Sequence, residues 1–121
     1  MTTPDDGDAY RALEREFTEG MYEAYRFLAR TINYRAIWLL DMLTQQGGKG
    51  AAKQLIYGKD ATYGLERLRE AGMLDRSVEA WVLDSRFEPL FTDEDRGRAR
   101  HRLEQYGFDV AGYLAGLREE E

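Results

Sequence analysis

The sequence predicts an all-α protein, and three observations lead to this fold class. Between the glycines, apolar residues recur every three or four positions, which places them on one face of a helix. No segment keeps a two-residue alternation, and no Asn-Gly or Asp-Gly pair joins two β-rich runs. The segment 34–43 is apolar around almost its whole circumference, as expected of a helix covered on most sides. We therefore expect a compact single-domain bundle of six to seven helices around a central buried helix at about 34–46.

Composition restricts the classes of function. The 121 residues fit one domain, and the hydrophobic share of 43% is typical of a folded chain. Cysteine is absent, which excludes a disulfide framework, a thiol nucleophile and a thiolate metal site. The net charge of −6 argues against nucleic-acid binding, because such modules usually carry a basic stripe. The chain has an acidic start and no long apolar run, so we expect no signal peptide, no membrane contact and a cytoplasmic location.

The N-terminal segment predicts one long amphipathic helix. We expect a disordered leader at 1–8, a single helical domain at 9–118 and an acidic tail at 119–121. Asp8 is expected to cap the first helix. Its apolar stripe consists of Tyr10, Leu13, Phe17, Met21, Ala24, Tyr25, Leu28 and Ile32. Tyr22 and Phe27 fall off this stripe, so they either widen the buried face or contact a partner.

Glycines and an asparagine mark the next boundaries. Asn33 is expected between the first helix and the central one. Gly47 and Gly48 end the central helix, because glycine accepts the left-handed conformation that a helix C-terminus often needs. A short helix over 49–57 follows, and Gly58 closes it.

In the next segment, Asp60 or Thr62 is expected to cap a helix that Gly72 ends. Asp75 or Ser77 caps a short helix over 78–84, and a proline makes 86–91 an irregular connection.

The last third of the chain predicts two further helices. Thr92 followed by Asp95 has the spacing of a capping box, so a helix starts there and ends at Gly107. Asp109 is expected to cap the last helix. The arginines at 96, 98, 100 and 102 fall on two flanks of the apolar stripe of the first of these helices. Acids at 93, 94, 95 and 104 of the same helix offset their charge, which favours salt bridges on a surface.

Glycines, apolar residues and acids recur at characteristic spacings from Gly47 onward. They are Gly47-Gly48, Ala52-Lys53, Leu55, Gly64, Leu68, Gly72, Leu74-Asp75, Ser77-Val78-Glu79-Ala80, Val82-Leu83, Phe87, Leu90-Phe91-Thr92, Glu94, Ala99-Arg100, Leu103 and Tyr106-Gly107. Through these residues the chain resembles a family of small, uncharacterised bacterial all-helical proteins. With a weaker match over 17–43, the resemblance covers about three-quarters of the chain. It implies an all-helical fold, and it brings no activity, cofactor or partner with it.

No cofactor or metal is expected. His101 is the only histidine, and it points away from the apolar face of its helix, which is typical of a solvated side chain. The run from Gly47 to Gly50 lacks the spacing of a phosphate-binding P-loop. Backbone amides beside Lys49 and Lys53 could hold an anion weakly, but a flexible interhelical turn is the favoured interpretation.

The segment 36–74 has the outline of a helix-turn-helix, which suggests a nucleic-acid-binding regulator as an alternative. Its last helix would expose Tyr63, Glu66, Arg67 and Glu70, and the two carboxylates disfavour an approach to phosphates. Such a regulator would bind through Tyr63, Arg67, Arg69 and Lys53.

Two acids lie among apolar residues, Asp41 on the central helix and Glu79 on the helix at 78–84. A buried carboxylate must pair with a cation, accept backbone hydrogen bonds or raise its pKa. Two partly buried acids could form a general acid–base pair, so an enzyme is a third hypothesis. Ion pairs that fix helix register are the favoured interpretation.

Our leading hypothesis is a non-enzymatic helical accessory protein that acts through protein–protein contacts, with a homodimer as one form. The motive is surplus apolar surface without a recognisable catalytic constellation. The candidate partner-binding residues are Tyr22, Phe27, Tyr63 and Arg67.

Overall fold

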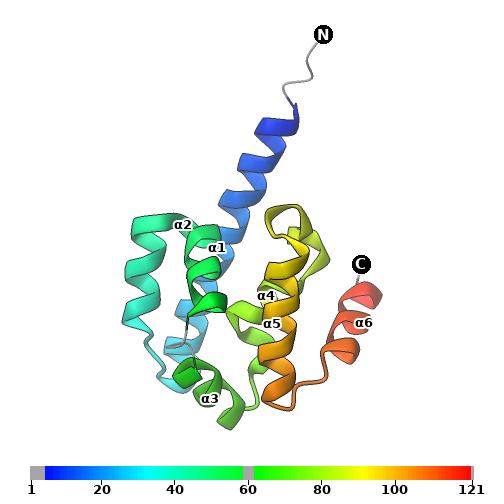
Figure 1. The fold of residues 1–121 in the computed structure, drawn as a ribbon. Coiled ribbons are helices and arrows are strands. Elements are labelled where there is room, and N and C mark those ends of the chain that lie inside the picture. The colour runs from blue at the N-terminus through cyan, green and yellow to red at the C-terminus, as the bar shows by residue number, and fades with distance from the viewer. Residues whose placement is uncertain (1–4, 59–61, 121) are drawn as a thin grey trace. The chain divides into compact units, whose positions relative to one another are not determined.

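The structure, a computed structural model, describes residues 5–58 and 62–120, and within these ranges it is all-α, as predicted (Figure 1). No strand occurs in the described ranges. The helices are α1 (Asp5–Ile32), α2 (Ile37–Tyr57), α3 (Thr62–Glu70), α4 (Val78–Leu83), α5 (Asp93–Gln105) and α6 (Val110–Glu120), with two 3-10 helices, η1 (Leu74–Arg76) and η2 (Ser85–Leu90).

The chain divides into two compact units, residues 1–51 and residues 52–121. The first unit holds α1 and most of α2. The second holds the last residues of α2 and all the helices that follow. We describe each unit by itself, and the single domain at 9–118 stays a prediction.

In the first unit, α1 buries the predicted stripe, with Phe17, Met21 and Leu28 shielded from solvent. The helix starts at Asp5, three residues before the predicted cap at Asp8, so residues 5–8 of the expected leader are helical. Residues 1–4 lie outside the described ranges. Acids in the first turn stabilise a helix through its dipole, which explains the early start. Asp8 lies inside the helix, where its carboxylate accepts a hydrogen bond from Arg11 at 2.9 Å.

The break inside α2 falls at Gly47, where the sequence predicts it. This residue has φ 75° and ψ 175°, and the helix resumes directly after it. Gly48 allows a close approach to α1, because an added Cβ would lie 2.8 Å from the Cα of Thr18. Its amide donates to the Thr18 hydroxyl at 2.8 Å, and that hydroxyl donates to the Glu14 carbonyl at 2.9 Å. The hydroxyl therefore joins the two helices of this unit.

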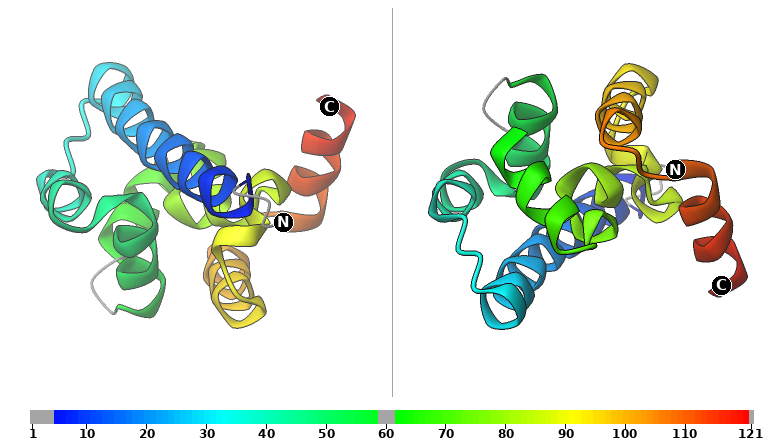
Figure 2. Two further views of the ribbon diagram at one scale, coloured as in Figure 1. Left: turned by 90° about the horizontal axis from the view of Figure 1, so that it is seen from above. Right: turned by 90° about the horizontal axis from the view of Figure 1, so that it is seen from below.

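The second unit is built on α4 packed against α5, as Figure 1 and Figure 2 show. Its fully buried side chains include Val82, Phe87 and Leu103. The segment 86–91 is expected to be irregular, but residues 86–90 lie within the 3-10 helix η2, and Phe91 follows it in an extended conformation.

Three predicted caps of the second unit are present, at Ser77, Thr92 and Asp109. Ser77 accepts from the Ala80 amide, and Thr92 and Asp95 form the reciprocal capping box. The Asp109 carboxylate accepts from the Gly112 amide at 3.0 Å, as expected of an N-cap. Gly72, with φ 69°, follows the end of α3 as predicted.

Two predicted boundaries fall partly outside the description. Asp60 lies outside the described residues, so its capping role stays a prediction. The helix α6 continues to Glu120, so the expected acidic tail is helical except for Glu121, which lies outside the described residues.

Candidate interaction surface

Two large apolar side chains are exposed side by side at the start of α2. Ile37 is 56% exposed and Trp38 is 40% exposed. Among the described residues, Tyr57 is the third large hydrophobic side chain with comparable exposure, but its hydroxyl is engaged within the second unit. The exposed Ile37–Trp38 pair differs from the expectation that this helix is covered on most sides.

The way α2 begins explains this exposure. Asn33 adopts a left-handed φ of 55° just after α1, and the amides of Leu39 and Leu40 both donate to the Ala36 carbonyl. The buried face of this part of α2 is the stripe Ala36, Leu39 and Leu43. Residues 37 and 38 fall outside this stripe on a helix of 3.6 residues per turn, so they face solvent.

Two opposite charges flank the apolar pair. Arg35 precedes Ile37 by two residues, Asp41 follows Trp38 by one turn, and both are exposed. Within the part of the chain that the structure describes, neither has an ion-pair partner. Some other exposed charges are paired, such as Arg26 with Glu23 at 2.5 Å. We call Arg35, Ile37, Trp38 and Asp41 the α2 surface.

The exposure of Asp41 corrects one expectation. The sequence predicts this acid to be partly buried, but it points away from the stripe formed by Leu39 and Leu43. The premise of two partly buried acids acting together therefore fails at this residue.

The four predicted partner-binding residues do not form the most exposed apolar surface. Tyr22 is half-buried, and its hydroxyl lies 3.5 Å from the Thr44 hydroxyl within the first unit. Phe27 and Arg67 are also half-buried. The side chain of Tyr63 lies outside the described residues.

Glu79 is buried, as the sequence predicts, and it is paired with Arg102. The Arg102 Nε donates to a Glu79 carboxylate oxygen at 3.1 Å, and the Arg102 Nη1 donates to the Gly58 carbonyl at 3.0 Å. Burial raises the pKa of Glu79, although the hydrogen bond from its own amide and the charge of Arg102 act in the opposite direction. The site joins α4 and α5 to the residue that follows α2, so its role is to hold these elements together.

A second buried acid, Asp95, gathers polar residues that the sequence does not connect. One carboxylate oxygen accepts from the Tyr57 hydroxyl at 2.8 Å. The other accepts from the Thr92 amide at 3.0 Å and lies 3.3 Å from the Lys53 ammonium. Burial alone would raise the pKa of Asp95, but the hydrogen bonds from Thr92, Tyr57 and Lys53 together hold it below its usual value. The hydrogen bond from the Tyr57 hydroxyl to Asp95 raises the pKa of Tyr57, and burial of the hydroxyl raises it further.

The cations expected to serve other functions have intramolecular partners. Lys53 pairs with Asp95, and Lys49 donates to the Tyr10 hydroxyl. Arg69 pairs with Glu66 and lies 5.6 Å from the centre of the Tyr106 ring. Both lysines of the anion site considered at 47–53 are therefore already engaged within the chain. Arg69 of the nucleic-acid surface considered on α3 is engaged in the same way. His101 is exposed, as expected.

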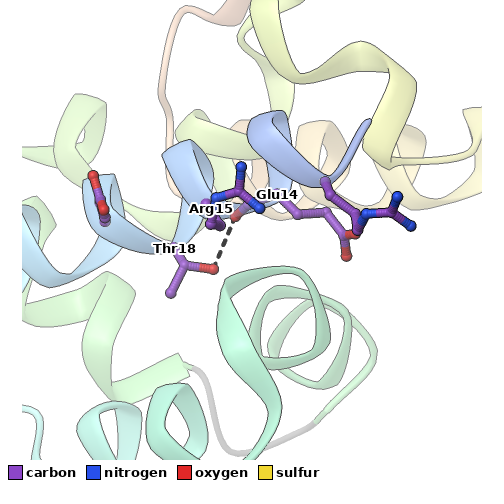
Figure 3. Close-up of a pocket in the computed structure, with 5 residues that line it drawn as sticks. Glu14, Arg15 and Thr18 are labelled. Carbon is purple, nitrogen blue, oxygen red and sulfur yellow. Dashed lines mark hydrogen bonds between the residues drawn. The ribbon is translucent and has the colours of Figure 1, made fainter. Parts of the chain in front are cut away.

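A shallow hollow of about 400 Å³ lies beside α1 (Figure 3). Its lining side chains are Arg11, Glu14, Arg15, Thr18 and Glu19. The labelled Thr18 side chain donates to the Glu14 backbone carbonyl, shown as the dashed line, so this hydroxyl is engaged within α1 itself.

The described residues contain no group of three or more acids, histidines or cysteines placed to hold a metal ion. In the same ranges, each helix is too short or too polar to cross a bilayer. No family model, curated protein or solved structure matches the chain. The protein is a small all-helical protein, and this general feature is the part of the sequence resemblance that the fold supports.

Proposed function

We propose that this protein is a non-enzymatic helical accessory protein that binds other protein chains through the α2 surface. The observation that carries the proposal is the adjacent exposure of Ile37 and Trp38. Tryptophan is enriched among the residues that dominate protein interfaces, because it combines a large apolar area with few rotatable bonds.

The free energy gained by burying Ile37 and Trp38 indicates how strong a contact they can support. Full burial of one large apolar side chain contributes about 1.5–3 kcal/mol, and Ile37 and Trp38 are already half covered. Together they supply on the order of 2–3 kcal/mol, well below the roughly 8 kcal/mol of a micromolar complex. The polar neighbours Arg35 and Asp41 must therefore contribute to affinity or specificity, and the contact is reversible.

The other two hypotheses receive less support from the polar residues. Lys53 and Arg69, which a nucleic-acid surface would need, are engaged with Asp95 and Glu66. The acid–base pair predicted from the sequence consists of Asp41 and Glu79, and Asp41 is exposed. A cytoplasmic location, and membership of the family of small bacterial helical proteins that the sequence resembles, complete this proposal.

The proposal is tested by capture from cells that express the chain. We compare the wild type with Trp38→Ser and use Gln45→Ser, at an exposed position later on the same helix, as the control. Bound chains, whether copies of this protein or others, are quantified after mild cross-linking. Loss of bound chains with Trp38→Ser alone is expected. Equal binding by all three proteins, or no binding by any, would overturn the proposal.

A further inference from the structure

We propose that the partner of the α2 surface is a second copy of this chain, related by a two-fold axis that passes close to Trp38. The inference rests on the proposed function and names its partner. It uses residues of the first unit alone.

The arrangement of charges around the start of α2, with Arg35 two residues before the helix and Asp41 within it, is the first argument. Arg35 lies three residues before Trp38, and Asp41 lies three residues after it. In a two-fold contact, a residue i of one copy that meets residue j of the other implies the reverse contact as well. When two α2 helices pair antiparallel about Trp38, Arg35 of each copy approaches Asp41 of the other.

The second argument is that these charges are available. Both side chains are exposed, and within the described ranges neither has a partner in its own chain. Several other charged side chains of α1 and α5 are paired within the chain, among them Arg11 with Asp8 and Arg100 with Glu104. An apolar centre between one free cation and one free anion is therefore complementary to itself.

The two ion pairs also supply what the apolar pair lacks. Opposite charges at an interface favour the correct register, and like charges facing each other weaken association strongly. The chain carries a net charge of −6, so two copies repel each other at long range. A fixed register with two compensating ion pairs offsets this repulsion where the copies meet.

The experiment exchanges the charges and measures molar mass by light scattering over a concentration series. With Arg35→Glu, an introduced glutamate faces Asp41 twice in the symmetric pair. With Asp41→Arg, two arginines face each other twice. We expect each variant alone to self-associate at least tenfold more weakly than the wild type, whereas an equimolar mixture of the two restores the dimer. The double variant Arg35→Glu/Asp41→Arg is expected to dimerise like the wild type.

The control variants are Arg15→Glu and Glu19→Arg, which make the same changes in net charge at exposed positions of α1. They should leave the dimer unchanged. The two-fold pairing would be overturned if the control variants weakened the dimer as much as the variants at positions 35 and 41. It would also be overturned if the equimolar mixture of Arg35→Glu and Asp41→Arg stayed monomeric. If the wild type is a monomer throughout but captures a different protein through Trp38, the self-pairing is wrong and the proposed function stands. If Trp38→Ser changes no association at all, both fail.

Discussion

Arg102 lies between Glu79 and Gly58 and donates hydrogen bonds to both, to the carboxylate at 3.1 Å and to the backbone carbonyl at 3.0 Å. The Glu79 side chain is 4% exposed and the Arg102 side chain is 16% exposed. The guanidinium therefore neutralises a buried acid and also holds Gly58, the residue directly after α2. This ion pair belongs to the stability of the second unit.

Removing the cation alone should be strongly destabilising. Arg102→Met leaves a buried carboxylate without its charge partner, so we expect the free energy of unfolding to fall by about 3–5 kcal/mol. Glu79→Met/Arg102→Met should recover much of this loss, because the uncompensated charge is gone. Urea unfolding followed by circular dichroism measures all the variants. A double variant no more stable than Arg102→Met would show that the charge is not the cause.

The lowered pKa of Asp95 predicts how stability depends on pH. A carboxyl group whose pKa is lower in the folded state stabilises the fold above its unfolded pKa, and this contribution is lost as the pH falls through the folded pKa. We expect Asp95→Asn to lower the free energy of unfolding by about 1–3 kcal/mol near pH 7, because an amide replaces a carboxylate that accepts three donors. The difference from wild type should shrink below about pH 4.

The control for this experiment is Asp93→Asn, at an exposed position two residues earlier on α5. Its effect should stay within about 0.5 kcal/mol. A difference between Asp95→Asn and wild type that stays constant from pH 7 to pH 2.5 would contradict the hydrogen-bonded role of this carboxylate.

The joint between Gly48 and Thr18 predicts opposite effects of alanine at two glycines. Gly48→Ala places a Cβ 2.8 Å from the Thr18 Cα and 2.9 Å from a Phe17 ring carbon, so the helices must separate. We expect a loss of about 1–3 kcal/mol. Gly97 on α5 has nothing within 4 Å of an added Cβ, so Gly97→Ala should stabilise by about 0.5–1 kcal/mol. Thermal unfolding separates the two, and a stabilising Gly48→Ala would disprove the close approach.

The sequence predicts features that depend on neighbouring residues along the chain. Ser77 and Thr92 cap their helices because a hydroxyl before an apolar run can accept a free amide of the first turn. Gly47 breaks α2 because glycine tolerates a positive φ. Each of these depends on a few adjacent residues, so one sequence suffices.

Features that depend on distant parts of the chain are not predictable in the same way. The capping box predicts that Asp95 meets Thr92, but not that Tyr57 and Lys53 reach the same carboxylate. Arg102 was expected on a surface because it shares one flank of α5 with Arg98, yet tertiary packing buries it beside Glu79.

The same limitation explains the candidate site. A helical wheel shows that Ile37 and Trp38 are apolar, but not which sides of the helix receive a neighbour. The sequence therefore placed both in the core, and the structure leaves them exposed.

The most direct test of the central claim is the fluorescence of Trp38 as a function of protein concentration. The chain has two tryptophans, so Trp81→Phe leaves Trp38 as the single reporter and keeps an aromatic ring beside Phe87. If the α2 surface pairs with a second copy, emission should shift to shorter wavelength and acrylamide quenching should weaken as concentration rises. With Asp41→Arg added, both changes should disappear. Emission and quenching that stay the same from low micromolar to millimolar concentration would contradict the claim.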